Sequence, residues 1–337
     1  MILRLSRFFL YVQVSAPGLE FRKRFSLLTC CVLFAAPAYT WGSDTSIPIR
    51  EIGQNRSFKD KAESLIDESH LQLRTGLSPE DQAIEKAVRY EIVEDETTAN
   101  ASAQRVDGVN FTFIGLGLLS VMDWVSTALA IDSEFGEHSC ATAYITQLAA
   151  DMNGNGAAAL QNQAPKKVGS PFIFAQSHTD LCPAMSELTF RSRARALSIR
   201  DLYFAGSIKL IIAHELGHHI HRDTWSPPAN DEESRAREAA ADSFCFRTLA
   251  LSGTVPIEGL PVMILATSIE GFSVEKEVDS DHPAAVRRLR NLIEESERAA
   301  DSDEAVRAAL IRSGRMQEWR QMIMVLKQQL DQLETRE

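Results

Sequence analysis

The chain has 337 residues, of which 46 are acidic and 35 are lysine or arginine, so its formal net charge is −11. A surface with this excess of negative charge is unsuited to a phosphate backbone, and no basic stretch with interleaved aromatic residues occurs in the sequence. Nucleic acid is therefore excluded as the main partner. Hydrophobic residues make up 45% of the chain, enough for a sizeable core in one or two domains.

Residues 1–38 have the features of an export signal. Three basic residues, Arg22 to Arg24, precede the apolar run 25–36, and Ala36-Pro37-Ala38 resembles a cleavage site before Tyr39. We therefore predict an exported protein, either periplasmic or secreted. An uncleaved N-terminal anchor is the alternative.

The segment 39–107 is polar, and we expect it to be partly helical. Ser78 followed by Pro79 predicts a helix start, because serine caps helix N-termini and proline suits the first turn. This helix is expected to run towards Tyr90. Residues 94–107 are acidic and rich in Thr, Ala and Ser, which is typical of a linker.

Residues 111–131 form an apolar stretch long enough to cross a bilayer. Asp123 lies near its centre, and a carboxylate there opposes membrane insertion by about 2.5–3.5 kcal/mol. We therefore favour a buried or membrane-surface helix over a transmembrane span. Membrane association through 111–131 stays open under both interpretations.

Removal of the signal would leave Cys140, Cys182 and Cys245 as the cysteines of the mature chain. In an oxidising compartment Cys140 and Cys182 could pair, whereas Cys245 is expected to be a small buried apolar residue. No C-x-x-C spacing occurs, so a zinc-finger site is not expected.

The region before the principal motif predicts three elements. Residues 154–169 contain glycine, asparagine and proline and predict a loop. The short apolar run 171–175 predicts a strand. Residues 186–205 predict a helix whose arginines are solvated or paired with acidic neighbours.

The run Ala213-His214-Glu215-Leu216-Gly217-His218 contains the pattern H-E-x-x-H. On an α-helix, residues four apart lie on one face, so His214 and His218 point at one spot. Two neutral imidazoles suit a zinc ion, and Glu215 lies beside that spot as a candidate general base. Because a catalytic zinc takes three protein ligands and leaves one position for water, a third ligand is expected elsewhere in the chain.

Glu238 is the candidate third ligand. It follows His218 at a separation that lets one helix end, a loop reverse the chain and a second helix return. Asp242 lies one turn later on the same face, where it could accept the free N–H of a ligating histidine. The metzincin pattern is excluded, because it needs glycine and histidine where this chain has His221 and Thr224.

Two other histidines follow the motif closely. His219 points away from the ligand face and is expected to be solvated. His221 returns to the ligand face but lies about 10 Å along the helix axis, so we interpret it as a polar helix end near the site.

The residues 214–218 and the run Glu238-Ala239-Ala240-Ala241-Asp242 resemble the H-E-x-x-H and E-x-x-A-D motifs of the gluzincin peptidases, in particular the family of the CAAX prenyl endopeptidase and the HtpX heat-shock protease. The run Asp281-His282-Pro283, followed by Arg288, is similar to that family's histidine-proline pair and the basic residue opening the next helix. The resemblance covers residues 208–292. The family's asparagine-alanine strand signature and its set of transmembrane helices are not found in this sequence.

The resemblance implies a zinc endopeptidase with one zinc ion per chain. Its metal ligands would be His214, His218 and Glu238, and Glu215 would be the general base that activates water. The partners implied are protein or peptide substrates.

Further residues acquire expected roles from the same resemblance. His282 or Arg288 would lie near the zinc and support the site or the developing oxyanion, and Asp242 would hold one ligating histidine. Such peptidases hold an extended substrate against a strand beside the zinc helix. Residues 171–175 are the candidate for that strand.

We therefore predict a mostly α fold with a small β element (α+β), a zincin-like domain built around the H-E-x-x-H helix and a facing E-x-x-A-D helix. The expected division is a signal at 1–38, a polar segment at 39–107, the metallopeptidase domain at 108–299 and a C-terminal helix at 300–337. That last helix would pack on the domain or form a dimer.

The predicted function is that of a zinc-dependent endopeptidase acting on proteins of the cell envelope, in protein quality control. One alternative is a non-catalytic zinc-binding chaperone or assembly factor. Another is a regulatory peptidase resembling the ImmA/IrrE family, which shares both motifs.

Overall fold

The computed structural model describes residues 56–94, 99–135, 140–160, 168–182, 186–259 and 285–321, together with residues 166, 323, 324 and 327. The predicted signal 1–38 and all of 260–284 lie outside this part of the chain. The described chain is mostly helical with one small sheet, in agreement with the predicted α+β class.

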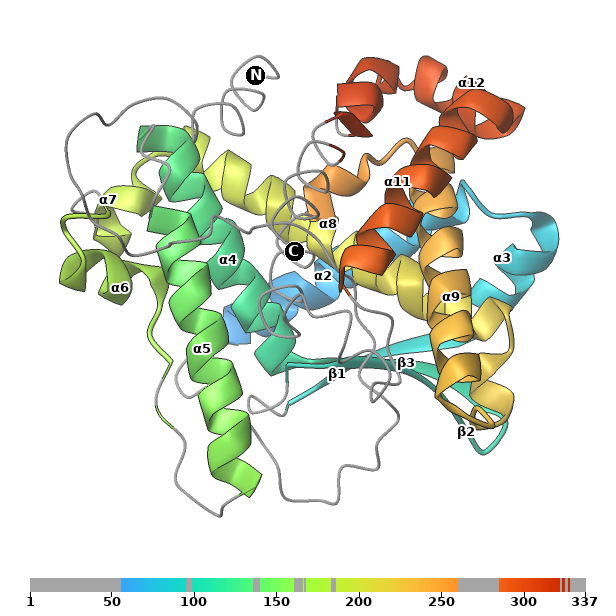
Figure 1. Cartoon of the computed structure of the whole chain (residues 1–337), viewed down its shortest axis with the longest axis horizontal. Coiled ribbons are helices and arrows are strands. Elements are labelled where there is room, and N and C mark those ends of the chain that lie inside the picture. The colour runs from blue at the N-terminus through green and yellow to red at the C-terminus, as the bar shows by residue number, and fades with distance from the viewer. Residues whose placement is uncertain are drawn as a thin grey trace.

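Several of the described helices pack around one long helix, α8 (Ala194–Ile220). In chain order the described helices are α2 (Arg56–Arg74), α3 (Pro79–Glu85), α4 (Leu116–Phe135), α5 (Cys140–Leu160), α6 (Pro171–Ser177), α7 (Glu187–Arg191), α8, α9 (Asp231–Leu251), α11 (Ala285–Ser302) and α12 (Glu304–Arg312), with the 3₁₀ helices η2 (Asp223–Trp225) and η3 (Pro256–Gly259). The long helix α8 packs against α9, α4, α2 and η3 (Figure 1). Many of its apolar residues, among them Phe204, Leu210 and Ile212, are fully buried, so α8 forms the centre of the core.

The sheet has three strands: β1 (Val88–Val93), β2 (Ala101–Val106) and β3 (Val109–Gly115). Their order is β1-β3-β2, with β3 parallel to β1 and antiparallel to β2. The turn between β2 and β3 is Asp107-Gly108, with φ values of 50° and 82°. Asp-Gly favours such a hairpin turn, because both central residues need positive φ. Because β3 lies in the middle of the strand order, β2 is one edge of the sheet. Figure 1 shows the sheet beside α8 and α9.

This sheet corrects two expectations about the N-terminal part of the chain. The helix capped by Ser78 is confirmed, but it ends at Glu85, and Tyr90 lies in β1. Residues 101–106 of the predicted linker form β2. The Asp107-Gly108 pair was the sequence signal for this hairpin, and the polar composition of the strand obscured it.

The apolar stretch 111–131 is divided between a strand and a helix. Its first residues, rich in aromatic and β-branched side chains, complete β3, and α4 begins at Leu116. The window Leu116–Glu134 is long and apolar enough to cross a membrane, but 89% of it is buried inside the fold. Arg200 of α8 donates to Asp123 over 2.6 Å, so the central carboxylate has a partner within the protein. The burial of α4 favours the buried-helix interpretation.

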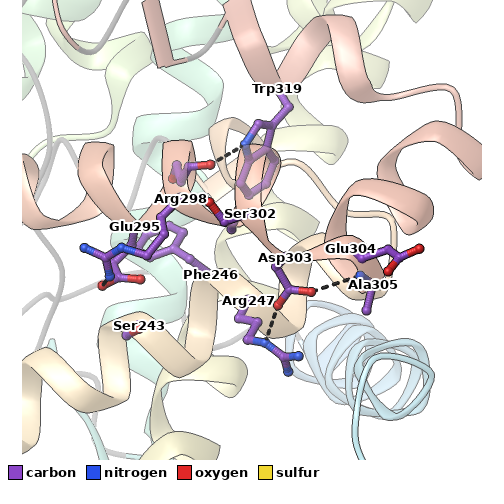
Figure 2. Close-up of a pocket in the computed structure, with 12 residues that line it drawn as sticks. Ser243, Phe246, Arg247, Glu295, Arg298, Ser302, Asp303, Glu304, Ala305 and Trp319 are labelled. Carbon is purple, nitrogen blue, oxygen red and sulfur yellow. Dashed lines mark hydrogen bonds and ion pairs between the residues drawn. The ribbon is translucent and has the colours of Figure 1, made fainter.

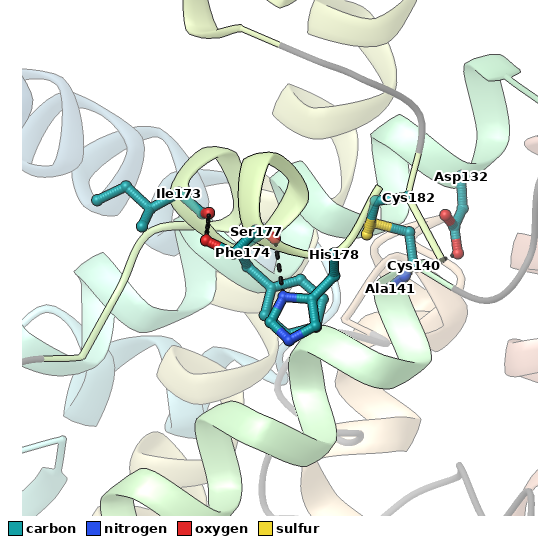
Figure 3. Close-up of a disulfide and its surroundings, with 8 residues drawn as sticks. All are labelled: Asp132, Cys140, Ala141, Ile173, Phe174, Ser177, His178 and Cys182. Atoms are coloured by element: carbon teal, nitrogen blue, oxygen red, sulfur yellow. Dashed lines mark hydrogen bonds between the residues drawn. A yellow bond between two sulfur atoms is a disulfide. The ribbon is translucent and has the colours of Figure 1, made fainter. Parts of the chain in front are cut away.

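A disulfide joins Cys140, at the start of α5, to Cys182, in the turn after α6 (Figure 3). Cys245 is buried in α9 outside the disulfide, and its Sγ donates to the carbonyl oxygen of Leu210 over 3.4 Å. Both expectations about the cysteines are confirmed. The carboxylate of Asp132 accepts the N–H of Ala141 over 2.9 Å, which holds the end of α4 to the start of α5 beside the disulfide.

The strand predicted at 171–175 is wrong, because these residues belong to helix α6. Ser170 accepts the N–H of Ile173, and Pro171 occupies the first turn, an arrangement that favours a helix start. Phe174 and Ala175 are buried while Ile173 is 52% exposed. A short continuous apolar run carries no period that separates helix from strand, so the capping residues were the better guide.

Three other boundaries differ from expectation. Helix α5 continues to Leu160, into the predicted loop 154–169. The predicted helix 186–205 is interrupted between α7 and α8. The predicted C-terminal helix 300–337 is divided: its first residues end α11, α12 follows from Glu304 to Arg312, and the chain turns at Gly314, where φ is 70°. The segment after this turn packs on the domain, because Trp319 is fully buried and its Nε1 donates to the carbonyl of Ser296 over 3.1 Å.

Candidate functional site

The two sequence motifs lie on the neighbouring helices α8 and α9 (Figure 1). Asn230 begins α9, and its side chain accepts the N–H of Glu233. The helices approach closely at Gly217, where an added Cβ would lie only 2.9 Å from the Cα of Ala241. Because both motifs meet at this crossing, their side chains converge on one buried place.

His214, His218 and Glu238 form the centre of the site. The Oε2 of Glu238 lies 3.4 Å from the Nε2 of His214, and its Oε1 lies 3.4 Å from the Nε2 of His218. The two Nε2 atoms are 3.3 Å apart. One ligand atom from each of the three buried residues lies within 4.8 Å of the others, so this group could hold a metal ion.

The opposite nitrogens of the two imidazoles are held by carboxylates. The Nδ1 of His214 lies 2.9 Å from Asp242, and the Nδ1 of His218 lies 3.0 Å from Asp223. Each imidazole can therefore donate its Nδ1–H outward and keep the lone pair of Nε2 for the common centre.

Asp242 lies where its spacing from Glu238 placed it, but Asp223 was not predicted. It belongs to η2, just beyond the end of α8. Helical periodicity does not extend past His221, so the sequence offered no spacing rule that would bring Asp223 back to His218.

The charges around the imidazoles favour a cation. Burial lowers the pKa of His214, but hydrogen bonds with Asp242 and Glu238 outweigh burial and raise it to about 10. Burial also lowers the pKa of His218, and Asp223 and Glu238 likewise raise it above its ordinary value. Two imidazoles and one carboxylate are also a donor set of catalytic zinc sites. The residues present therefore fit a divalent metal ion.

Glu215 is buried beside this centre, with 3% of its surface exposed. Burial raises the pKa of its carboxyl group, and the neighbouring histidines oppose that shift. The backbone N–H of Ala103 donates to the carboxylate. A carboxyl group with a raised pKa can take up and release a proton closer to neutral pH, as a general base requires.

The contact with Ala103 places the edge strand β2 beside Glu215. Within the described chain, the strand in contact with Glu215 of α8 is therefore β2, whereas residues 171–175 belong to helix α6. Because β2 pairs only with β3 within the described sheet, its other edge is turned towards the site.

His219 corrects another expectation, because it is 1% exposed rather than solvated. Its Nε2 lies 3.1 Å from the carbonyl oxygen of Phe111 and 3.2 Å from the hydroxyl of Thr112. Burial lowers the pKa of His219 to about 4, so the neutral ring donates to strand β3. The face of α8 that carries His219, one turn after Glu215, is thus covered by the sheet. His221 is the exposed C-terminal cap of α8, as expected of a polar helix end.

Arg237 fixes the loop that carries Asp223. Its guanidinium donates to the carbonyl oxygens of Asp223 over 3.0 Å and Ser226 over 2.7 Å. It also donates to the carboxylate of Glu233 over 2.6 Å. Because Arg237 directly precedes Glu238, the same turn of α9 supplies a candidate ligand and holds the partner of His218.

The remaining predicted residues are not placed by the structure. His282 lies outside the described residues, and Arg288 belongs to α11 without a described side chain. Their roles near the metal stay predictions.

A cavity of about 480 Å³ lies elsewhere, between α9, α11 and α12 (Figure 2). Arg247 and Asp303 belong to its lining, and the Nε of Arg247 donates to the Oδ2 of Asp303 over 3.0 Å. The three candidate metal ligands are not among the residues that line it. The chemistry of the two motifs is therefore separate from this cavity.

Comparison with known proteins bears on the same helices. Residues 161–310 match the model of a family described as Peptidase U49. This range contains both motifs and covers less than half of the chain. The match supports a peptidase. Neither the curated proteins nor the solved structures gave a match.

Proposed function

We propose that the chain is a zinc-dependent endopeptidase that hydrolyses peptide bonds of protein substrates in the cell envelope. The observation that carries the proposal is the convergence of His214, His218 and Glu238 at one buried place, with Glu215 beside them. The resemblance of both motifs to those of the gluzincin peptidases supports it, as does the match to a peptidase family.

In the proposed mechanism each residue has a separate role. Zinc, when bound by His214, His218 and Glu238, supplies a Lewis acid for water and for the peptide carbonyl. Glu215 takes the proton of the attacking water and delivers it to the leaving amine. The raised pKa of Glu215 favours this transfer, because burial brings its two protonation states closer in free energy near neutral pH.

The substrate is proposed to bind in an extended conformation along β2. An exposed strand edge can bind a peptide through backbone hydrogen bonds and leave alternate side chains to determine specificity. The contact between Ala103 and Glu215 supports this placement, because it brings the edge next to the proposed general base.

The location in the cell envelope rests on two observations. Residues 1–38 carry the sequence features of an export signal, and the disulfide between Cys140 and Cys182 is typical of proteins in oxidising compartments. A role in protein quality control follows only from the resemblance to the HtpX protease.

Metal content and cleavage of unfolded casein, measured on the same preparations, test the proposal. The wild type and Glu215→Gln should each retain a single zinc ion, whereas Glu238→Ala should lose it, because two imidazoles alone bind the ion weakly. Glu215→Gln should also lose cleavage by about 10²–10⁴-fold, since glutamine cannot accept the proton.

The outcomes separate the proposal from its alternatives. Absence of zinc from the wild type, or full zinc in Glu238→Ala, would refute the ligand assignment. Bound zinc without cleavage of any unfolded protein would favour the non-catalytic chaperone. Full cleavage by Glu215→Gln would remove that residue from the mechanism.

A further inference from the structure

Two arginine side chains lie against one exposed tryptophan. The guanidinium carbon of Arg105 is 4.3 Å from the ring centre of Trp225, and that of Arg222 is 5.1 Å from it. Trp225 is 57% exposed, and both arginines are exposed as well. We name these three residues the Arg-Trp-Arg cluster.

The cluster is connected to the candidate metal site from two sides. Trp225 follows Asp223, the partner of His218, by two residues within η2. Arg105 follows Ala103, the partner of Glu215, by two residues along β2. Alternate residues of a strand share a face and the same hydrogen-bonding edge, and two residues span about 6.6 Å. The cluster therefore lies one alternate position along the strand from Glu215.

The two guanidinium groups keep their charge available. Among the residues that the structure describes, neither Arg105 nor Arg222 forms an ion pair, although the whole chain carries a net charge of −11. By contrast, Arg237 and Arg200 are paired with carboxylates nearby. A guanidinium stacked on an indole loses little of its donor capacity, because its N–H groups point outward in the plane of the group.

The backbone at Arg222 gives a second observation. Its φ of 64° and ψ of 24° lie in the left-handed region, which disfavours side chains other than glycine and asparagine by roughly 1–2 kcal/mol. Such conformations cluster at functional sites, where they place a particular side chain. Here the turn at the end of α8 directs an arginine onto Trp225.

We propose that the Arg-Trp-Arg cluster is a substrate subsite that binds the carboxylate of a glutamate or aspartate side chain, about two residues from the cleaved peptide bond. The proposal rests on the proposed peptidase function and on binding of the peptide along β2. The indole, against which both arginine side chains stack, holds the two guanidinium groups in place. These groups bind the carboxylate of the acidic residue with charge-assisted hydrogen bonds.

Binding to a variant that does not cleave tests the proposal. The probes are two peptides of Val, Thr and Ser, which favour an extended conformation. Both have blocked ends and carry an uncharged dye. They differ only at the central residue, which is Glu in one peptide and Gln in the other. Fluorescence anisotropy would measure their affinity for full-length, zinc-loaded Glu215→Gln. The Glu peptide should bind about tenfold more tightly than the Gln peptide, the effect of one charge-assisted hydrogen bond.

Substitution of both arginines should remove that preference. In the same Glu215→Gln background we expect Arg105→Gln with Arg222→Asn to bind both peptides with similar affinity. Asparagine is chosen because it tolerates the left-handed backbone of residue 222. The matched control is Arg89→Gln, which removes an exposed arginine stacked on Phe111 at the opposite edge of the sheet. This control should keep the tenfold preference.

Equal binding of the two peptides to the parent variant, or a preference that survives the double substitution, would overturn the subsite. The proposed peptidase function is tested separately by zinc content and casein cleavage. A protein that prefers the Glu peptide but cleaves nothing would retain the subsite and lose the enzymatic proposal. Because both peptides have blocked ends, a preference cannot come from a terminal carboxylate.

Discussion

At the scale of single residues, the two imidazoles of the site are oriented by carboxylates of different origin. Asp242 belongs to α9, the helix that also carries Glu238. Asp223 belongs to the 3₁₀ turn η2 after α8 and is held there by Arg237. A carboxylate that accepts the outer N–H of a ligating histidine fixes its tautomer and raises its basicity.

We expect Asp223→Asn to weaken zinc binding by about 10–100-fold, because the amide keeps the size of the side chain but loses its charge. Competition with a chromophoric chelator would measure the affinity. The control is Asp231→Asn, the same change at an exposed position in the first turn of α9. An unchanged affinity in Asp223→Asn would show that the ring of His218 is held by other means.

At the scale of elements, the distance between α8 and α9 decides whether the motifs meet. Gly217 lies between the two motif histidines and faces the backbone of Ala241. No side chain can be accommodated there without moving one helix, because the obstacle is backbone rather than a flexible side-chain end. The glycine therefore permits the packing that brings Glu238 to the histidines.

We expect Gly217→Ala to destabilise the fold by about 1–3 kcal/mol through overpacking, although alanine favours a helix more than glycine does. The shift of α9 should also weaken zinc binding. Urea unfolding and chelator competition would measure the two effects. Gly154→Ala in α5 is the matched control, since a Cβ there meets nothing within 4 Å. That variant should be neutral or slightly stabilised, and equal stability of both variants would contradict the close approach.

At the scale of the whole molecule, the disulfide ties the helices α5 and α6 together on the part of the domain away from α9 (Figure 1). Cys140 and Cys182 are 42 residues apart in sequence. Closing a loop of this length restricts the unfolded chain, which stabilises the fold by about 4 kcal/mol on the chain-entropy model.

We therefore expect the double variant Cys140→Ala with Cys182→Ala to lose about 4 kcal/mol of unfolding free energy while it retains zinc. Urea unfolding in oxidising buffer would measure the loss, and the wild type in reducing buffer should match the variant. Zinc should be retained because the candidate ligands belong to α8 and α9. A loss of zinc at low urea concentration would show that the two parts of the domain are coupled.

Several features followed from the sequence because they depend on residues close together in the chain. The spacing of His214 and His218, the cap at Ser78 and the position of Asp242 relative to Glu238 all rest on helical geometry over one or two turns. The pairing of Cys140 with Cys182, with Cys245 outside the disulfide, followed from the number of cysteines and the export signal. In each case a local rule was enough.

Tertiary structure decided the features that depend on contacts between distant segments. The sequence offered no partner for Asp123 in its apolar stretch, whereas in the fold Arg200 of α8 donates to its carboxylate. The hydrophobicity of 171–175 suggested a strand beside the site, yet these residues form α6 and the strand in contact with Glu215 is β2. His219 was expected to be solvated, but β3 covers it. Local spacing carries no information about such pairings, because chain reversal and packing bring the partners together. The sequence by itself thus determined the candidate ligands, the candidate base and Asp242. Only the fold decided the pairing of Asp223 with His218, the adjoining strand edge and the Arg-Trp-Arg cluster.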